Sequence, residues 1–165
     1  MREDEALWIQ VTRRSAAAFE QIYSDHFARV RGFLRIYLGD AAVVDDVAQE
    51  TFLQLWQRPG GFDPSRSSLK TYLLGIARKK AADWWRRHRP AEPVEPETAT
   101  VSQSSTLPLR DAFERLDPDA RNVLWLREVE GYSYGELARI LDVPLGTVKS
   151  RLFAAREQLR RVWKG

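Results

Sequence analysis

One stretch near the middle of the 165-residue chain cannot contribute to a hydrophobic core. Residues 90–109 lie within RPAEPVEPETATVSQSSTLPLR, which is rich in proline, glutamate, serine and threonine and nearly lacks large apolar side chains. This composition is typical of a flexible, acidic linker. Residues 1–89 and 110–165 must therefore each build a modest core, and we expect two small domains.

Composition restricts the chemistry that these domains can perform. The chain contains no cysteine and only two histidines, His26 and His88, which excludes a disulfide framework, a thiolate nucleophile and a cysteine-ligated zinc site. No apolar run is long enough to cross a bilayer, and the N-terminal MREDEALWIQ does not resemble a secretory leader. We expect a cytoplasmic protein without metal or cofactor and without membrane insertion.

The basic residues gather in two separate segments. The net charge is only +3, from 26 basic and 23 acidic residues. The segment RKKAADWWRRHR (78–89) nevertheless contains six basic residues and one acid, and residues 149–164 contain the same numbers. Two separate basic helices predict two contacts with a polyanion. In the first segment we expect Trp84 in the core, whereas Trp85 could be either a core residue or a stacking platform for bases.

The first domain is predicted to be helical throughout. An amphipathic helix runs from Ser15 to Leu38 and is stopped by Gly39, and Asp40 is expected to cap the next helix. Ser68 is expected to cap another helix that begins at Leu69. Helical spacing predicts the buried residues of the last two helices: Val44, Val47, Ala48, Thr51, Phe52 and Leu55, then Leu69, Tyr72, Leu73, Ile76 and Ala77.

The other face of the helix after Asp40 carries a polar stripe. Four residues follow one another at positions i, i+3, i+4 and i+7: Asp46, Gln49, Glu50 and Leu53. From spacing alone, a solvated helix face is the simpler interpretation, and a docking surface is the alternative.

The second domain contains the pattern of a helix-turn-helix. Asp117 and Pro118 can begin a helix that ends near Gly131. SYGE, residues 133–136, is a capping box that starts a short helix with Leu137, Ile140 and Leu141 inward, and a turn at residues 142–144 leads into the last helix. The second helix of such a motif enters the DNA major groove.

The last helix is predicted to present a cationic face. If Val148, Leu152 and Ala155 face the core, the outward residues are Lys149, Ser150, Phe153 and Arg156. Lys and Arg can donate to guanine, Ser can bond to a base or a phosphate, and an aromatic ring can contact a thymine methyl. The alternative is a face that only confers solubility.

Three quoted segments resemble the extracytoplasmic-function sigma factors of the bacterial sigma-seventy family. FEQIYSDHFARVRGFLRIYLGDAAVVDDVAQETFLQLW (19–56) and FDPSRSSLKTYLLGIARKKAADWWRRHR (62–89) are similar to the family's second conserved region. LDPDARNVLWLREVEGYSYGELARILDVPLGTVKSRLFAAREQLR (116–160) is similar to its fourth region. The resemblance implies an all-α fold, with a region 2 domain over residues 1–89, a flexible linker over 90–109 and a region 4 helix-turn-helix domain over 110–165.

The resemblance also implies partners and site residues. A sigma factor binds core RNA polymerase, and Asp46, Gln49 and Glu50 match the positions that dock on the clamp helices of its largest subunit. Leu53, on the same stripe, would then become part of the interface. The loop from Gly61 to Ser68 would hold a base flipped from the single-stranded minus-ten element. The implied minus-ten residues are Phe62, Ser67, Ser68, Lys70, Tyr72, Arg78, Lys79, Trp85, Arg86 and Arg87. The implied contacts to the duplex minus-thirty-five element are Thr147, Lys149, Ser150, Arg151, Phe153 and Arg156.

A protein of this family is not an enzyme, and melting of promoter DNA would use binding energy, because no Walker-type ATP-binding motif is present. The resemblance further implies an anti-sigma partner. The free protein is expected to bind promoter duplex weakly, because its two domains would be loosely tethered until polymerase organises them.

Two other classes of protein compete with this interpretation. A two-domain helix-turn-helix regulator could bind duplex DNA without polymerase, although the polar stripe and the basic, tryptophan-rich helix would then have no purpose. A nuclease could use Asp45, Asp46 and Glu50 as metal ligands. These three lie on one helix without a supporting histidine or a second carboxylate cluster, and they make a poor metal site.

Overall fold

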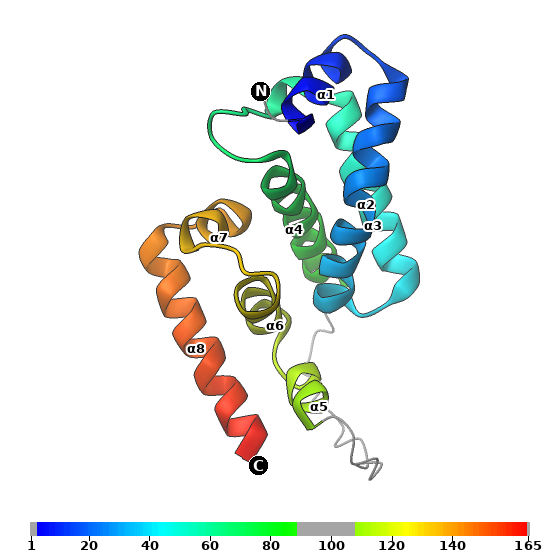
Figure 1. The fold of residues 1–165 in the computed structure, drawn as a ribbon. Coiled ribbons are helices and arrows are strands. Elements are labelled where there is room, and N and C mark those ends of the chain that lie inside the picture. Colours follow the sequence, from blue (N-terminus) through cyan, green and yellow to red (C-terminus); the bar gives the residue numbers. More distant parts are fainter. Residues whose placement is uncertain (1–2, 89–107, 165) are drawn as a thin grey trace.

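Helices make up the regular structure of the described residues, which are 3–88 and 108–164 of the computed structural model (Figure 1). The first domain contains α1 (Glu3–Thr12), α2 (Ala16–Leu38), α3 (Ala41–Gln57), the 3₁₀ turn η1 (Pro59–Gly61) and α4 (Leu69–His88). The second contains α5 (Pro108–Glu114), α6 (Pro118–Leu124), the π-helical turn η2 (Trp125–Val129), α7 (Tyr134–Leu141) and α8 (Leu145–Lys164). The all-α prediction is confirmed. Residues 90–107 of the expected linker lie outside the described residues, and its last two residues belong to α5.

The expected helix ends are confirmed by their capping contacts. The Ser15 side chain accepts a hydrogen bond from the Ala18 backbone N–H at the start of α2, and Gly39 ends that helix with a φ of 78°. Such a positive φ suits glycine because it has no Cβ. The Asp40 carboxylate then accepts from two backbone N–H groups at the start of α3. These contacts fix the sharp reversal that lays α3 against α2.

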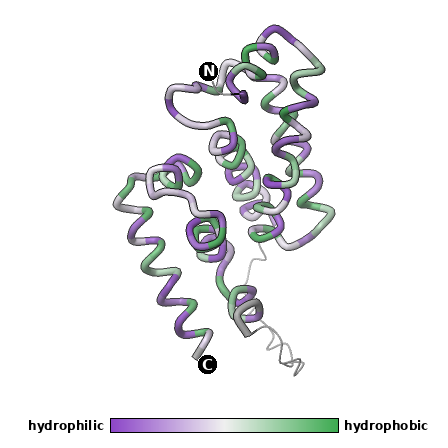
Figure 2. Tube along the Cα trace, in the orientation of Figure 1, coloured by the Kyte–Doolittle hydropathy of each residue, from purple (hydrophilic) through white to green (hydrophobic). Residues whose placement is uncertain are grey.

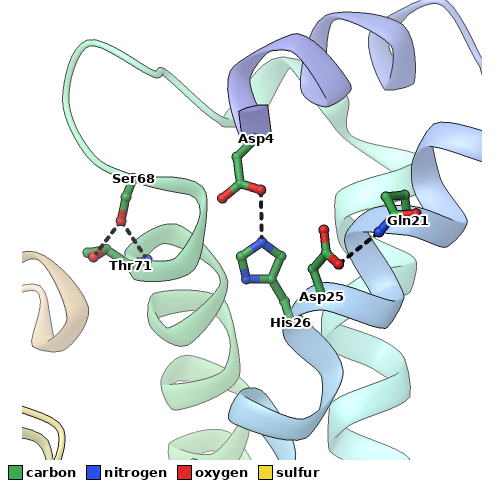
Figure 3. Close-up of polar contacts among 6 residues, drawn as sticks. All are labelled: Asp4, Gln21, Asp25, His26, Ser68 and Thr71. Atoms are coloured by element: carbon green, nitrogen blue, oxygen red, sulfur yellow. Dashed lines mark hydrogen bonds and ion pairs between the residues drawn. The ribbon is translucent and has the colours of Figure 1, made fainter. Parts of the chain in front are cut away.

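Helix α1 lies in the domain predicted to be helical, but its own range was not predicted. Its Trp8 is 4% exposed and meets the ring of Phe62 edge-on, with ring centroids 5.2 Å apart. Asp4 lies 3.3 Å from Nε2 of the buried His26 on α2 (Figure 3). One of the two histidines therefore serves to anchor α1 on the bundle.

The buried stripes of α3 and α4 lie where helical spacing placed them, with one exception. All six expected residues of α3 are buried, and so are four of the five on α4. Tyr72 is only half-buried, because it lies at the edge of α4 beside the preceding loop and shares a contact with Phe62. The Ser68 hydroxyl accepts from the Thr71 N–H at 3.2 Å and thus caps α4 as expected (Figure 3).

The second domain differs in detail from the expected helix between Pro118 and Gly131. Asp117 caps α6 as expected, with its carboxylate accepting from the Ala120 N–H, but the helix then widens into the π-helical turn η2. Gly131 follows with a φ of 75°. Sequence periodicity does not reveal a single π-helical turn, because its i→i+5 hydrogen bonds involve only a few residues.

The two domains pack against each other. In Figure 1, α7 lies beside α4 and α6 lies near α2, and both pairs of helices are in contact. Helix α8 covers the far side of α6 and α7, and hydrophobic and hydrophilic residues alternate along it (Figure 2). The buried residues form one cluster that continues through both domains. This arrangement differs from the loose tether expected from the sequence, because apolar and charged surfaces of the two domains are complementary.

Candidate polymerase and nucleic-acid interfaces

The polar stripe of α3 faces away from the bundle. Asp46, Gln49, Glu50 and Leu53 are all exposed, and Leu53 is 51% exposed although it is a large apolar residue. Within the described residues no ion pair engages Asp46 or Glu50, whereas the neighbouring Asp45 binds Arg31 at 2.8 Å. The stripe therefore offers free carboxylates beside an exposed leucine.

A shallow apolar groove of about 440 Å³ adjoins this stripe between α2 and α3. Gln49 and Leu53 form one edge, and its other lining residues include Phe19, Tyr23 and Trp56. Phe19 packs on Trp56 with ring centroids 5.1 Å apart. These aromatic residues were not predicted as site residues, although Phe19 and Tyr23 are spaced i, i+4 on one face of α2. The candidate interface thus combines negative charge with an aromatic groove.

The loop before α4 is held by its own hydrogen bonds. Asp63 accepts from both the N–H and the hydroxyl of Ser65, at 2.9 and 2.6 Å. These hydrogen bonds, chiefly that from the hydroxyl, lower the pKa of Asp63. Phe62 is 7% exposed and packs between Trp8 and Tyr72, so it anchors the loop to the core of the domain. Arg66 at the tip is exposed.

A cleft of about 880 Å³ opens between this loop, α4 and α7. It brings together three of the residues implied for the minus-ten element, Ser67, Tyr72 and Lys79, while Arg139 and Asp142 of α7 and its C-cap contribute the opposite wall. Burial raises the pKa of the Tyr72 phenol. The cleft offers polar groups and one aromatic ring, as a base-binding pocket requires.

The C-terminal half of α4 carries aromatic side chains that are held by contacts and arginine side chains that are exposed. Trp85 is half-buried and donates its indole N–H to the Tyr37 carbonyl at 3.3 Å, so it is held against the core. Trp84 stacks on His88 with ring centroids 4.5 Å apart. Arg86 and Arg87 are exposed at the helix end, where Arg86 pairs with Asp83. The guanidinium groups of Arg86 and Arg87 are therefore accessible to phosphates, whereas only part of the Trp85 ring is accessible to a base.

The helix-turn-helix is built as its capping box predicts. The Ser133 hydroxyl accepts from the Glu136 N–H and the Glu136 carboxylate accepts from the Ser133 N–H, each at 3.1 Å. Asp142 ends α7 in the left-handed conformation, with a φ of 55° and a ψ of 52°. Aspartate is one of the few residues other than glycine that adopt this conformation readily. After this turn the first residues of α8, Leu145 and Gly146, are exposed to solvent.

Helix α8 presents the expected residues on its outer face. Val148, Leu152 and Ala155 are buried, and the exposed residues are Lys149, Ser150, Phe153 and Arg156. Phe153 is 67% exposed. Thr147 and Arg151 are half-buried at the margins of this face.

Arg156 has a partner that the sequence did not reveal. Its guanidinium donates to the Glu128 carboxylate at 2.8 Å, and this hydrogen bond is the main reason that the pKa of Arg156 is raised. Glu128 lies on the π-helical turn η2, which brings it next to α8. The carboxylate occupies a place beside Arg156 that a phosphate or base acceptor could take.

The described residues contain neither a metal-ligand cluster nor a membrane-spanning helix. No cluster of three or more histidine, aspartate or glutamate side chains there could hold a metal ion. Likewise, none of the described helices has the length and apolar character needed to cross a membrane.

Two family models match the chain, one in each domain. Sigma-70 region 2 matches residues 22–91, and Sigma-70 region 4 matches residues 106–159. The chain is 33% identical to the ECF RNA polymerase sigma factor RpoE of Cereibacter sphaeroides, with 97% of each chain covered. It is 29% identical to the RNA polymerase sigma factor CarQ of Myxococcus xanthus, with 88% of each covered.

A solved structure shares the fold across both domains. The structure of CnrH in complex with the cytosolic domain of CnrY matches with a TM-score of 0.73 and 25% identity, and the match covers 98% of this chain and 97% of CnrH. The helices, the two matched regions and the full-length relatives agree, and the chain belongs to the extracytoplasmic-function RNA polymerase sigma factors of the sigma-70 family.

Proposed function

We propose that this chain binds core RNA polymerase and directs promoter recognition and opening at the start of transcription. The observation that carries the proposal is the exposed stripe on α3, with unpaired Asp46 and Glu50 beside Leu53 and an aromatic groove. A helix-turn-helix regulator that acts without polymerase would not need this surface. An acidic and apolar stripe is complementary to a basic coiled coil, and charge complementarity of this kind fixes the register of docking.

The outer face of α8 and the cleft beside α4 would each bind a different element of the promoter. The outer face of α8, with Lys149, Phe153 and Arg156, would read the duplex minus-thirty-five element in the major groove. The cleft beside Tyr72 would take a base flipped from the minus-ten element, and Arg86 and Arg87 would neutralise phosphates of the opened strand. Domain boundaries at residues 89 and 110 would let the two surfaces reach the two elements separately.

The proposed subunit acts through binding alone. It is not an enzyme and takes no cofactor, because strand opening draws on the contacts that the flipped base and the phosphates gain. It works in the cytoplasm, where the polymerase and the DNA are. The solved structure of CnrH holds it in complex with the cytosolic domain of CnrY, and we propose that this chain also has a protein partner, an anti-sigma protein that regulates it.

Transcription in vitro tests the proposal. Core polymerase without any sigma subunit is incubated with genomic fragments of the source organism, with and without this chain, and the 5′ ends of the transcripts are mapped. Discrete start sites that appear only with the chain, with permanganate-reactive thymines upstream of each, would support the proposal. If the chain binds genomic duplex but no start site appears, it is a helix-turn-helix regulator instead.

A further inference from the structure

The face of α4 that borders the cleft is occupied by another part of the same chain. Gly75, in the N-terminal half of α4, faces α7, and a Cβ added to it would be in van der Waals contact with the Ile140 carbonyl at 3.8 Å and the Arg139 carbonyl at 3.9 Å. Ile76 beside it is 6% exposed. The backbones of α4 and α7 are thus in near contact, with glycine at the crossing point.

Polar contacts surround this crossing. The Tyr37 hydroxyl donates to Asp119 at 2.9 Å, and Arg29 lies 3.4 Å from the Glu130 carboxylate. The interface therefore extends from α2 to the start of α6 and the end of η2.

Two lysines of α4 complete the interface. The Lys79 ammonium lies 3.7 Å from the Asp142 carboxylate, and the Lys70 ammonium lies 4.7 Å from the centre of the Tyr132 ring. Both lysines are among the residues implied for the minus-ten element. An oxygen anion and an aromatic ring are also what a strand of DNA would present to them, as phosphate and base.

The surfaces proposed for the other partners stay open in this arrangement. Asp46 and Glu50 on α3 are exposed, and so are Lys149 and Phe153 on α8. The packing of the two domains therefore covers one functional surface and leaves two accessible.

We propose that the helix-turn-helix domain docks on α4 in the free protein and competes there with the opened promoter strand. The inference rests on the proposed function for the identity of that strand, but the docking itself does not depend on it. Polymerase can engage the exposed stripe of α3 first, and the two domains must then separate before the minus-ten element can bind. Because the domains belong to one chain, their effective concentration is about millimolar, and a contact whose dissociation constant lies below that concentration keeps most of the protein closed.

Two variants and a reversible crosslink test the docking. Gly75→Gln places a side chain against the α7 carbonyls and should open the protein, whereas Gly32→Gln on α2 is the matched control, since nothing lies within 4 Å of a Cβ there. The chain has no cysteine, so Arg29→Cys with Glu130→Cys gives a unique pair for a short, cleavable thiol crosslinker across the interface. We expect rapid crosslinking in the Gly32→Gln background and slow crosslinking in the Gly75→Gln background. Equal rates in both would overturn the docking.

A second readout tests the competition. Binding of a fluorescein-labelled, single-stranded 20-mer of random sequence is measured by anisotropy before and after cleavage of the crosslinker. Cleavage of the crosslinker should restore binding, because only the released protein can open. If nine-tenths of the released protein is closed, its apparent affinity is about one-tenth of that of the fully open form. Equal binding by the locked and released protein would overturn the competition. Failure of the chain to bind core polymerase would refute the proposed function but not the docking.

Discussion

Leu152 and Phe153 are adjacent on α8 yet face opposite environments, and replacing each by alanine should have opposite consequences. Leu152 is fully buried at 0% exposed, and Phe153 is 67% exposed. A buried Leu→Ala substitution costs about 2 to 5 kcal/mol, through lost apolar burial and the cavity left behind. A unit of about 57 residues has a total stability of roughly 3 to 9 kcal/mol, so Leu152→Ala should unfold much of the second domain. Phe153→Ala should change the free energy of unfolding by about 0.5 kcal/mol or less.

Urea unfolding followed by circular dichroism at 222 nm measures both effects, and mobility shift of polymerase holoenzyme on a minus-thirty-five duplex measures recognition. Phe153→Ala should weaken duplex binding without loss of stability, because only its DNA-facing surface is removed. If Phe153→Ala destabilised the protein as much as Leu152→Ala, or if Leu152→Ala were neutral, the orientation assigned to α8 would be wrong.

Three further predictions concern other elements. Lys149→Ala should weaken minus-thirty-five binding by about 1 to 3 kcal/mol in the same holoenzyme assay if its contact is to a base edge, and unchanged affinity would remove Lys149 from the readout. Ser133→Ala should lower the free energy of unfolding by about 1 kcal/mol, because it leaves the Glu136 N–H uncapped; a thermal melt that does not shift would refute the role of the capping box. Burial, followed by the nearby Asp119, raises the pKa of Tyr37, so the folded protein keeps the phenolic proton to a higher pH than the unfolded chain does. The stability that this confers is complete below about pH 10 and is lost as pH rises further, and a Tyr37→Phe variant whose urea midpoint fell just as steeply above about pH 10 would contradict the assignment.

Much of the fold was predictable because its signals are local. Side chains that cap a helix act within three residues, so Asp40, Ser68, Asp117 and Ser133 could all be identified as helix starts from the sequence, and each accepts the expected backbone hydrogen bond. Helical periodicity likewise gave the buried face of α3 and the exposed face of α8.

The features that were missed depend on contacts between distant residues. Helix α1 has a weak amphipathic pattern and is recognised only by its contacts, such as that of Asp4 with His26. Neither the Glu128 partner of Arg156 nor the packing of α7 on α4 has a local signal, since each joins segments far apart in the chain. Gly75 carries no side chain to mark the crossing point at all. Its role follows only from the neighbouring backbone.

Binding to core RNA polymerase tests the central claim most directly. The intact chain, an Asp46→Ala, Gln49→Ala, Glu50→Ala variant and a control with Gln21→Ala, Asp25→Ala and Asp111→Ala are each titrated into core polymerase that lacks any sigma subunit. The control also removes one amide and two carboxylates, all from exposed positions on α2 and α5 rather than on α3. We predict that the intact chain and the control bind equally and that the α3 variant binds far more weakly. If the intact chain did not bind, or if the α3 variant bound as well as the control, the proposed role of this surface would be contradicted.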